Sequence, residues 1–241
     1  MDLSTLKEIV IPEGKVTKIE RSGVVLWSAV AEEPPQPTKI YQEVEWIQAD
    51  TDVGAYLDLG FAFDTKAKVE LSQYISGNAN TYIFGCAENS GKLRCMITSP
   101  YYSSGKHISY PFGSTGSANL QGAGIGHNDN AWNEFEAIFE KGNLSMTNKT
   151  NGNTGSKTTQ GAYTMANNLY LFAQNYNGSA RFGAMRRIGY FKYYDKNGTL
   201  ICDLMPCYRI ADGVIGMYDK IRDTFLTNIG SGTFTKGADV N

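Results

Sequence analysis

The sequence has 241 residues, enough for one large domain that buries a core without a disulfide or metal ion. Its 26 glycines and 15 tyrosines, with only 19% charged residues, are typical of short strands and turns and argue against a helical bundle. The net charge of −2 comes without a basic block, so charge predicts no nucleic-acid or membrane partner. No apolar stretch approaches the roughly 20 residues of a membrane-spanning helix, and the N-terminus lacks a secretion-signal pattern.

Residues 1–30 are expected to form a short N-terminal β segment. Between residues 8 and 27, β-branched runs alternate with Pro-Glu-Gly and Arg-Ser-Gly turns, which predicts three strands. So short a segment cannot enclose a core alone, so its apolar run needs cover from the body, a sister subunit or a different protein. We expect the attachment residues to be those of this run: Val24, Val25, Leu26 and Trp27.

A proline-rich stretch follows this segment. Three of the seven prolines lie within Pro34–Pro37, which favours an extended, semi-rigid spacer over residues 31–39. The remaining residues, 40–241, are long enough to form a domain of their own.

The body contains one short apolar or alternating run after another. In the run at 132–139, Phe135, Ala137 and Phe139 point one way and the glutamates point the other. No stretch has the length and caps of a helix. We therefore predict an all-β antiparallel sandwich or jelly roll. The predicted strands include 66–72, 81–86, 93–97, 132–139, 169–173, 187–194 and 199–202.

The four cysteines do not have the spacing of a structural zinc site. Cys86 and Cys95 flank a short polar turn, and a hairpin there would place them nearly opposite each other. A disulfide and a pair of packed thiols are both compatible with this spacing, and we favour the packed pair.

Two polar stretches, 99–131 and 145–161, are predicted to be long loops, which are where binding sites commonly lie. Tyrosine and tryptophan rings stack on sugars, while nearby amides and carboxylates bind hydroxyl groups. The same residue types also bind proteins, or pack over a sheet, so the alternatives stay open. The candidate ligand-binding residues are Tyr101, Tyr102, Tyr110, Asn128, Asp129, Trp132 and Tyr176.

His107 and His127 are the only histidines, and both fall in predicted loops. A zinc site or a nucleophilic triad needs further ligands or a nucleophile beside the histidine. The sequence has no H-x-x-x-H, H-E-x-x-H or G-x-S-x-G pattern that would supply them. We expect both to be polar surface residues, and we predict no catalytic residue and no bound metal at them.

The body resembles the concanavalin A-like (LamG-type) jelly-roll modules that are frequent in phage and prophage structural proteins. The resemblance covers about residues 40–236 and implies a jelly-roll sandwich preceded by a short N-terminal β anchoring segment. The run from Ile9 to Trp27 is similar to N-terminal segments of phage tail and head appendages. The matching stretches of the body are Tyr41–Ile47, Tyr56–Phe61, Arg187–Phe191, Leu200–Cys207, Gly216–Asp219 and Gly230–Phe234.

Hydrolases of this fold carry an E-x-D-x-x-E pattern on one strand face. The nearest match begins at Glu134 and Glu136, but Phe139 occupies the last position and Glu140 comes one residue late. We therefore expect solvent-facing glutamates and no enzyme. The resemblance also leaves a calcium ion possible at the rim, near 50–52 or 127–130, against the simpler interpretation of polar loops.

The layout and the resemblance together imply a phage virion appendage of the head or tail, made in the host cytoplasm. Its N-terminal segment would bind other virion proteins, and we expect a homo-oligomer, assumed to be a trimer by analogy with phage appendages. The jelly roll would bind host-surface or mucosal glycans weakly, with many copies adding strength. The alternatives are a purely structural decoration or fibre protein without a ligand and, less in keeping with the acidic pattern, a glycoside hydrolase.

Overall fold

The computed structural model describes the chain in two units, Met1–Lys39 and Ile40–Asn241, which are treated separately. No helix is present in the described ranges, so none there is long and apolar enough to cross a membrane. The described residues are 18–21 and 24–28, as strand backbone, and 39–50, 54–77, 81–88, 93–100, 105–110, 123–158, 164–181 and 183–241.

In the first unit, strand β1 (Lys18–Arg21) pairs antiparallel with β2 (Val24–Ser28). Two of the three expected strands are therefore confirmed, and the earliest lies outside the described residues. The spacer prolines, and the side chains of the expected attachment run, also lie outside them. Attachment through this segment stays a prediction.

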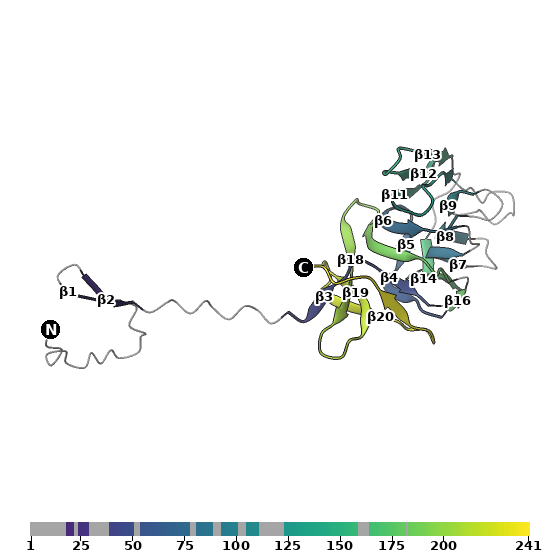
Figure 1. Cartoon of the computed structure of the whole chain (residues 1–241). Helices are drawn as coiled ribbons and strands as arrows, with labels where there is room; N and C mark the ends of the chain where they lie inside the picture. The colour runs from purple at the N-terminus through teal and green to yellow at the C-terminus, as the bar shows by residue number, and fades with distance from the viewer. Residues whose placement is uncertain are drawn as a thin grey trace. The chain divides into compact units, whose positions relative to one another are not determined.

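The body consists of two β-sheets that face each other (Figure 1). In the described part of the chain, the smaller has eight strands in the order β10-β9-β8-β7-β14-β5, with β15 paired to β7 and β16 to β15. Its strands are β5 (Leu57–Asp64), β7 (Tyr82–Glu88), β8 (Leu93–Thr98), β9 (His107–Tyr110), β10 (Ala123–Ile125), β14 (Thr164–Leu171), β15 (Gln174–Tyr176) and β16 (Ser179–Arg181).

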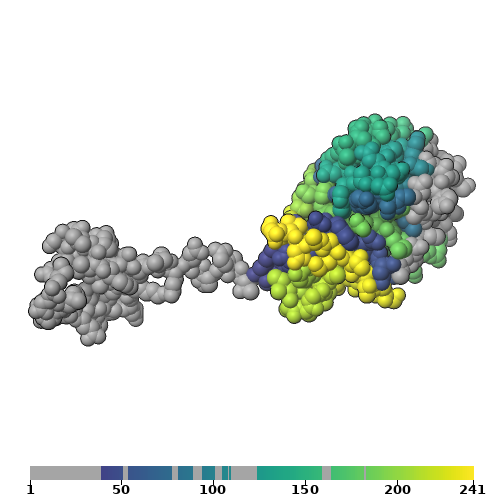
Figure 2. Space-filling model, in the orientation of Figure 1, coloured from purple at the N-terminus to yellow at the C-terminus, as the bar shows by residue number. Residues whose placement is uncertain are grey.

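The larger sheet has eleven strands among the described residues, eight of them in the order β13-β12-β11-β6-β17-β18-β19-β20. The first strands of the body pair with late ones, β3 with β18 and β4 with β21, and Figure 2 shows these segments side by side. The strands are β3 (Tyr41–Glu43), β4 (Ile47–Ala49), β6 (Ala67–Ile75), β11 (Ala131–Glu140), β12 (Asn143–Asn148), β13 (Thr154–Lys157), β17 (Arg187–Tyr194), β18 (Leu200–Arg209), β19 (Ile215–Asp219), β20 (Thr224–Thr227) and β21 (Phe234–Lys236).

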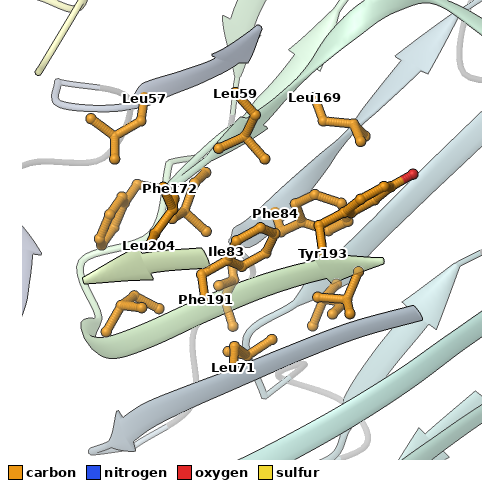
Figure 3. Close-up of a cluster of buried hydrophobic side chains, with 14 of the residues drawn as sticks. Leu57, Leu59, Leu71, Ile83, Phe84, Leu169, Phe172, Phe191, Tyr193 and Leu204 are labelled. Carbon is orange, nitrogen blue, oxygen red and sulfur yellow. The ribbon is translucent and has the colours of Figure 1, made fainter. Parts of the chain in front are cut away.

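The core lies between the two sheets (Figure 3). Phe84 of the smaller sheet and Phe191 of the larger meet with ring centroids 5.2 Å apart, and both are fully buried. Alternation along each strand places apolar side chains in this layer and polar ones outside, as in β6 and β11. The all-β jelly-roll sandwich expected from the sequence is confirmed, including the inward direction of Phe135, Ala137 and Phe139.

The hairpin of β7 and β8 places Cys86 opposite Cys95, as expected. Both thiols are free and buried, so they pack as small apolar groups and form no disulfide. Burial raises the pKa of both thiols well above the ordinary value, which keeps them protonated and unreactive.

The expectation that 99–131 and 145–161 are loops throughout is wrong. They contain β9, β10, the end of β12 and all of β13. β9 and the end of β12 carry polar residues on their buried side, and some of these residues bond to buried polar groups of other strands. Asn148 Nδ2, for example, donates to Asn133 Oδ1 over 2.8 Å, and both residues are fully buried.

Candidate functional site: a groove on the outer face of the larger sheet

Strand register arranges the outward side chains of the larger sheet in rows. In the first row Arg187 lies opposite Tyr74, which lies opposite Trp132. The Trp132 ring is 37% exposed and meets Tyr74 edge-on, with centroids 5.8 Å apart. The Arg187 guanidinium lies over two rings, 4.5 Å from the centroid of Trp46 and 5.2 Å from that of Tyr74. The exposed indole of Trp132 therefore lies at one end of a row of side chains that contact one another.

In the second row, Ser72 lies opposite both Tyr190 and Glu134. Gly189 forms a bulge beside this row, and a Cβ there would lie 3.2 Å from Cζ3 of Trp132 and 3.3 Å from Oγ of Ser72. The missing side chain leaves room for a hollow of about 410 Å³. The residues lining it are Glu45, Ser72, Trp132, Glu134, Gly189 and Tyr190.

A second hollow, of about 430 Å³, adjoins the first at Gly189 and Tyr190. Its other walls include charged side chains of both signs. We call the two hollows together the outer groove, whose second half is lined by Glu43, Glu70, Lys192, Asp203, Leu204, Met205 and Lys220 in addition to the two shared residues.

The next row of carboxylates is paired with lysines. Glu70 lies opposite Glu136, and Lys149 Nζ lies 3.0 Å from Glu136 Oε2 and 3.5 Å from Glu70 Oε1. Lys68 Nζ lies 2.7 Å from Glu70 Oε1. Burial alone would raise the pKa of Glu70, but the bond from Lys68 and the charges of Lys149 and Lys68 hold that pKa below its usual value. This row is therefore an ionised network.

The Tyr190 hydroxyl stays protonated at physiological pH. Burial, reinforced by the carboxylates of Glu134 and Glu70, raises the pKa of Tyr190 to about 12. Tyr190 therefore offers both a ring face and an O–H donor at the junction of the two hollows.

Of the seven ligand-binding candidates from the sequence, Trp132 lines the outer groove. Asn128 and Asp129 are exposed in the turn before β11, and the backbone N–H of Asn128 donates to the Asn133 side chain. Tyr176 lies in the smaller sheet, where the Arg181 guanidinium is 3.9 Å from its ring centroid. Tyr110 belongs to β9, with its side chain outside the description, and Tyr101 and Tyr102 lie wholly outside it.

Sequence reasoning missed Tyr190, Gly189, Ser72 and Glu45 as site residues. A partial signal was present in β6 itself, because Ser72 lies at one of the outward positions that alternate with buried ones. Such outward positions are candidates for a binding face on a sheet. Which of them meet depends on register between strands distant in the sequence.

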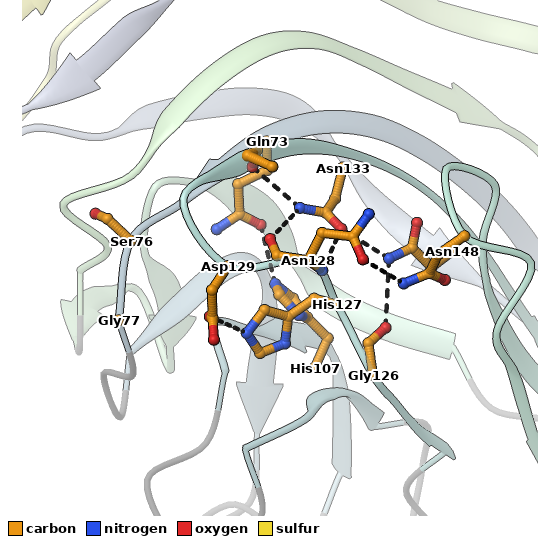
Figure 4. Close-up of polar contacts among 12 residues, drawn as sticks. Gln73, Ser76, Gly77, His107, Gly126, His127, Asn128, Asp129, Asn133 and Asn148 are labelled. Atoms are coloured by element: carbon orange, nitrogen blue, oxygen red, sulfur yellow. Dashed lines mark hydrogen bonds and ion pairs between the residues drawn. The ribbon is translucent and has the colours of Figure 1, made fainter.

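The expectation that both histidines are polar surface residues in loops is wrong for His107, whereas His127 does lie in a loop but has a largely buried side chain (Figure 4). His107 belongs to β9 and is fully buried, with Nε2 3.2 Å from Oε1 of Gln73 and its ring centroid 4.4 Å from that of Phe135. Only 5% of the His127 side chain is exposed, and its Nε2 lies 2.8 Å from Oδ1 of Asp129. Near the turn that leads into β11, His107 has the buried amide of Gln73 as its partner and His127 has the exposed carboxylate of Asp129.

The buried His107 predicts loss of stability in mild acid. Burial, aided by the charges of His127 and Arg186, holds the pKa of His107 well below its ordinary value of 6.5. Because the folded pKa is the lower one, the unfolded chain binds the proton first as the pH falls below 6.5. We expect the free energy of unfolding to drop by about 1.4 kcal/mol per pH unit below that point.

The measurement is urea unfolding at pH 7 and pH 5 for the wild type and for His107→Gln, which removes the titrating group. The variant should be less stable at pH 7 but should lose less stability between the two pH values. Equal losses in the two proteins would contradict the assignment.

Among the residues that the structure describes, no group of three or more His, Cys, Asp or Glu side chains is arranged to hold a metal ion. Of the residues considered for calcium, Asp129 bonds to His127, Asp50 accepts a bond from the Thr233 hydroxyl, and Asp52 lies outside the description. Calcium binding at the rim stays a prediction.

No family model matches the sequence, and no curated protein is similar to it in sequence. Among solved structures, domains LG4-5 of the mouse laminin α1 chain match 71% of this chain at 16% identity with a TM-score of 0.49, and this chain spans 47% of theirs. A protein from Bacteroides ovatus described as carbohydrate-binding matches 83% of this chain and 62% of its own, at 10% identity and a TM-score of 0.48.

Tailspike protein 2 of an Escherichia coli O157:H7 bacteriophage matches 67% of this chain and 27% of its own, at 11% identity and a TM-score of 0.38. Similarity at these levels does not identify a ligand or a partner for this chain.

Proposed function

We propose that residues 40–241 form a carbohydrate-binding module whose ligand lies in the outer groove. The observation that carries this proposal is the exposed Trp132 ring beside the protonated Tyr190, with Gly189 leaving room between them. A sugar presents an apolar C–H face to an aromatic ring and hydroxyl groups to polar neighbours. Ser72 and Glu134, in the same hollow, supply such neighbours.

The module is proposed to bind glycans without cleaving them. A retaining or inverting hydrolase needs one carboxyl group with a raised pKa as the proton donor. The pKa of Glu70 is lowered instead, and both Glu70 and Glu136 are tied to lysines. Glu134 points outward and is exposed, in keeping with a surface contact. A reducing-sugar assay on the glycans that bind should remain at background.

Trp132→Ala and Tyr190→Ala are each expected to weaken glycan binding by about tenfold or more, because each removes an aromatic contact at the centre of the groove. The measurement uses the immobilised full chain with a panel of bacterial surface polysaccharides and microbial oligosaccharides. Tyr176→Ala is the matched control, since it removes a partly exposed ring from the smaller sheet. It should bind like the wild type.

Two results would contradict the proposal. One is that no glycan in the panel binds, even when many copies are displayed together, which would favour a purely structural protein. The other is that Tyr176→Ala abolishes binding while Trp132→Ala leaves it intact, which would move the site to the smaller sheet.

For the whole chain we propose a phage virion appendage, with residues 1–30 attaching the module to other virion proteins and copies of the chain assembling together, as a trimer by analogy. A two-stranded hairpin on its own is marginally stable in water, so a partner surface would stabilise the pair β1–β2. Many copies per particle would strengthen weak binding to host-surface or mucosal glycans. An electron-microscopy map of phage particles purified from cells that make the chain tests this, and a map without density for the chain would contradict the assignment.

A further inference from the structure

Two carboxylates in the first hollow are left without a counter-charge. Glu45 and Glu134 line the hollow with Trp132, and neither takes part in an ion pair among the described residues. Glu45 Oε2 accepts one long bond, 3.4 Å from the backbone nitrogen of Ala238. The hollow is thus both aromatic and negatively charged.

Three basic groups near this hollow contact other groups, and a fourth, Lys220, lines the second hollow. The Arg187 guanidinium lies over the rings of Trp46 and Tyr74. Lys149 lies 3.0 Å from Glu136, and Lys192 lies 3.8 Å from Asp203. No basic group among the described residues forms an ion pair with Glu45 or Glu134, which favours a ligand that brings positive charge to them.

We propose that the first hollow selects glycans with free, protonated amino groups, that is, amino sugars without their N-acetyl groups. An ammonium group is attracted to the face of an exposed indole and forms charge-assisted hydrogen bonds with carboxylates. Trp132, Glu45 and Glu134 supply both kinds of contact in one hollow. Glycans rich in carboxylate or sulfate would be repelled. This inference rests on the proposed function, and in it Glu45 and Glu134 determine which sugars bind.

The test is calorimetric titration of the full chain with three oligosaccharides of equal length: oligo-glucosamine, its N-acetylated form and oligo-galacturonate. Oligo-glucosamine should bind about tenfold more tightly than the N-acetylated form, and the difference should shrink as salt is raised. Glu45→Gln and Glu134→Gln, each close in shape to the original, should reduce the difference. The combined variant should abolish it.

Glu140→Gln is the matched control, because Glu140 lies at the far end of β11, outside both hollows, and pairs with Lys66. It should keep the full preference for oligo-glucosamine. Equal binding of the amino and N-acetylated forms by the wild type, or tighter binding of oligo-galacturonate, would overturn the inference while leaving the proposed function standing. Failure of every sugar in the wider panel would remove both.

Discussion

Replacing Asp219 with alanine is expected to lower the free energy of unfolding by about 3–5 kcal/mol, because it leaves the partly buried positive charge of Arg222 without its partner. Asp219 ends β19 and is fully buried. It accepts hydrogen bonds from the backbone N–H groups of Asp203, at 3.2 Å, and Ile221, at 2.9 Å, and pairs with the Arg222 guanidinium. The same guanidinium donates to the Leu59 carbonyl in the smaller sheet. The substitution therefore removes the counter-charge of a contact between the two sheets.

The matched control is Asp212→Ala, because Asp212 also pairs with an arginine three residues away, Arg209, but on the exposed surface. Exposed pairs contribute little to stability, so this control should unfold at nearly the wild-type denaturant concentration. Equal effects of Asp219→Ala and Asp212→Ala in guanidinium unfolding would contradict the prediction.

The Asp219 carboxylate also links stability to pH. Burial would raise the pKa of Asp219, but the bonds from Arg222 and from the backbone of Asp203 and Ile221 hold that pKa below its ordinary value of 3.8. Because the folded pKa is the lower one, its contribution is present above the ordinary value and is lost as the pH falls through the folded value.

Gly85→Ala is expected to lower the free energy of unfolding by about 3 kcal/mol or more, because it combines backbone strain with a steric clash. Gly85 lies in the middle of β7 with φ at +137°, a conformation that side-chain-bearing residues rarely adopt. An added Cβ would collide with the Cys95 carbonyl oxygen and lie 2.5 Å from Cα of Met96, both backbone atoms of the neighbouring strand β8. Backbone atoms in a paired strand cannot move aside cheaply.

Gly198→Ala separates the two causes. Gly198 also has a positive φ, +79°, but an added Cβ there would meet no atom within 4 Å. The variant Gly198→Ala should therefore lose only the free energy of unfolding that backbone strain costs, about 1 kcal/mol. Similar losses for the two variants in thermal and chemical unfolding would show that the close approach of β8 to Gly85 does not matter.

The sequence predicted well which apolar side chains point into the core and predicted poorly which polar side chains are buried. The alternation that sent Phe135 and Phe139 inward is a local pattern, and so is the turn that brings Cys86 opposite Cys95. By contrast, β9 and β13 lie in stretches whose composition indicates loops. In β9 the buried His107 bonds to Gln73 of β6, which is distant in the sequence, and no local pattern reveals such a partner.

The candidate site, too, could be predicted only in the part that depends on local sequence. Trp132 was identifiable from its own neighbourhood, next to the polar turn that begins β11. Its partners Ser72 and Tyr190 come from β6 and β17, and only the pairing of β11 and β17 on either side of β6 brings all three together. The bulge at Gly189, which leaves room for the hollow, is likewise a product of strand register.

The most direct test of the glycan groove is an NMR titration that follows the indole N–H signal of Trp132 in the full chain. The signal is assigned by its disappearance in Trp132→Ala, and the titrant is the glycan that binds best in the panel. We predict that the Trp132 signal shifts and saturates with the dissociation constant measured by calorimetry. A glycan that binds with that constant and leaves the Trp132 signal unmoved would show that the groove is not the binding site.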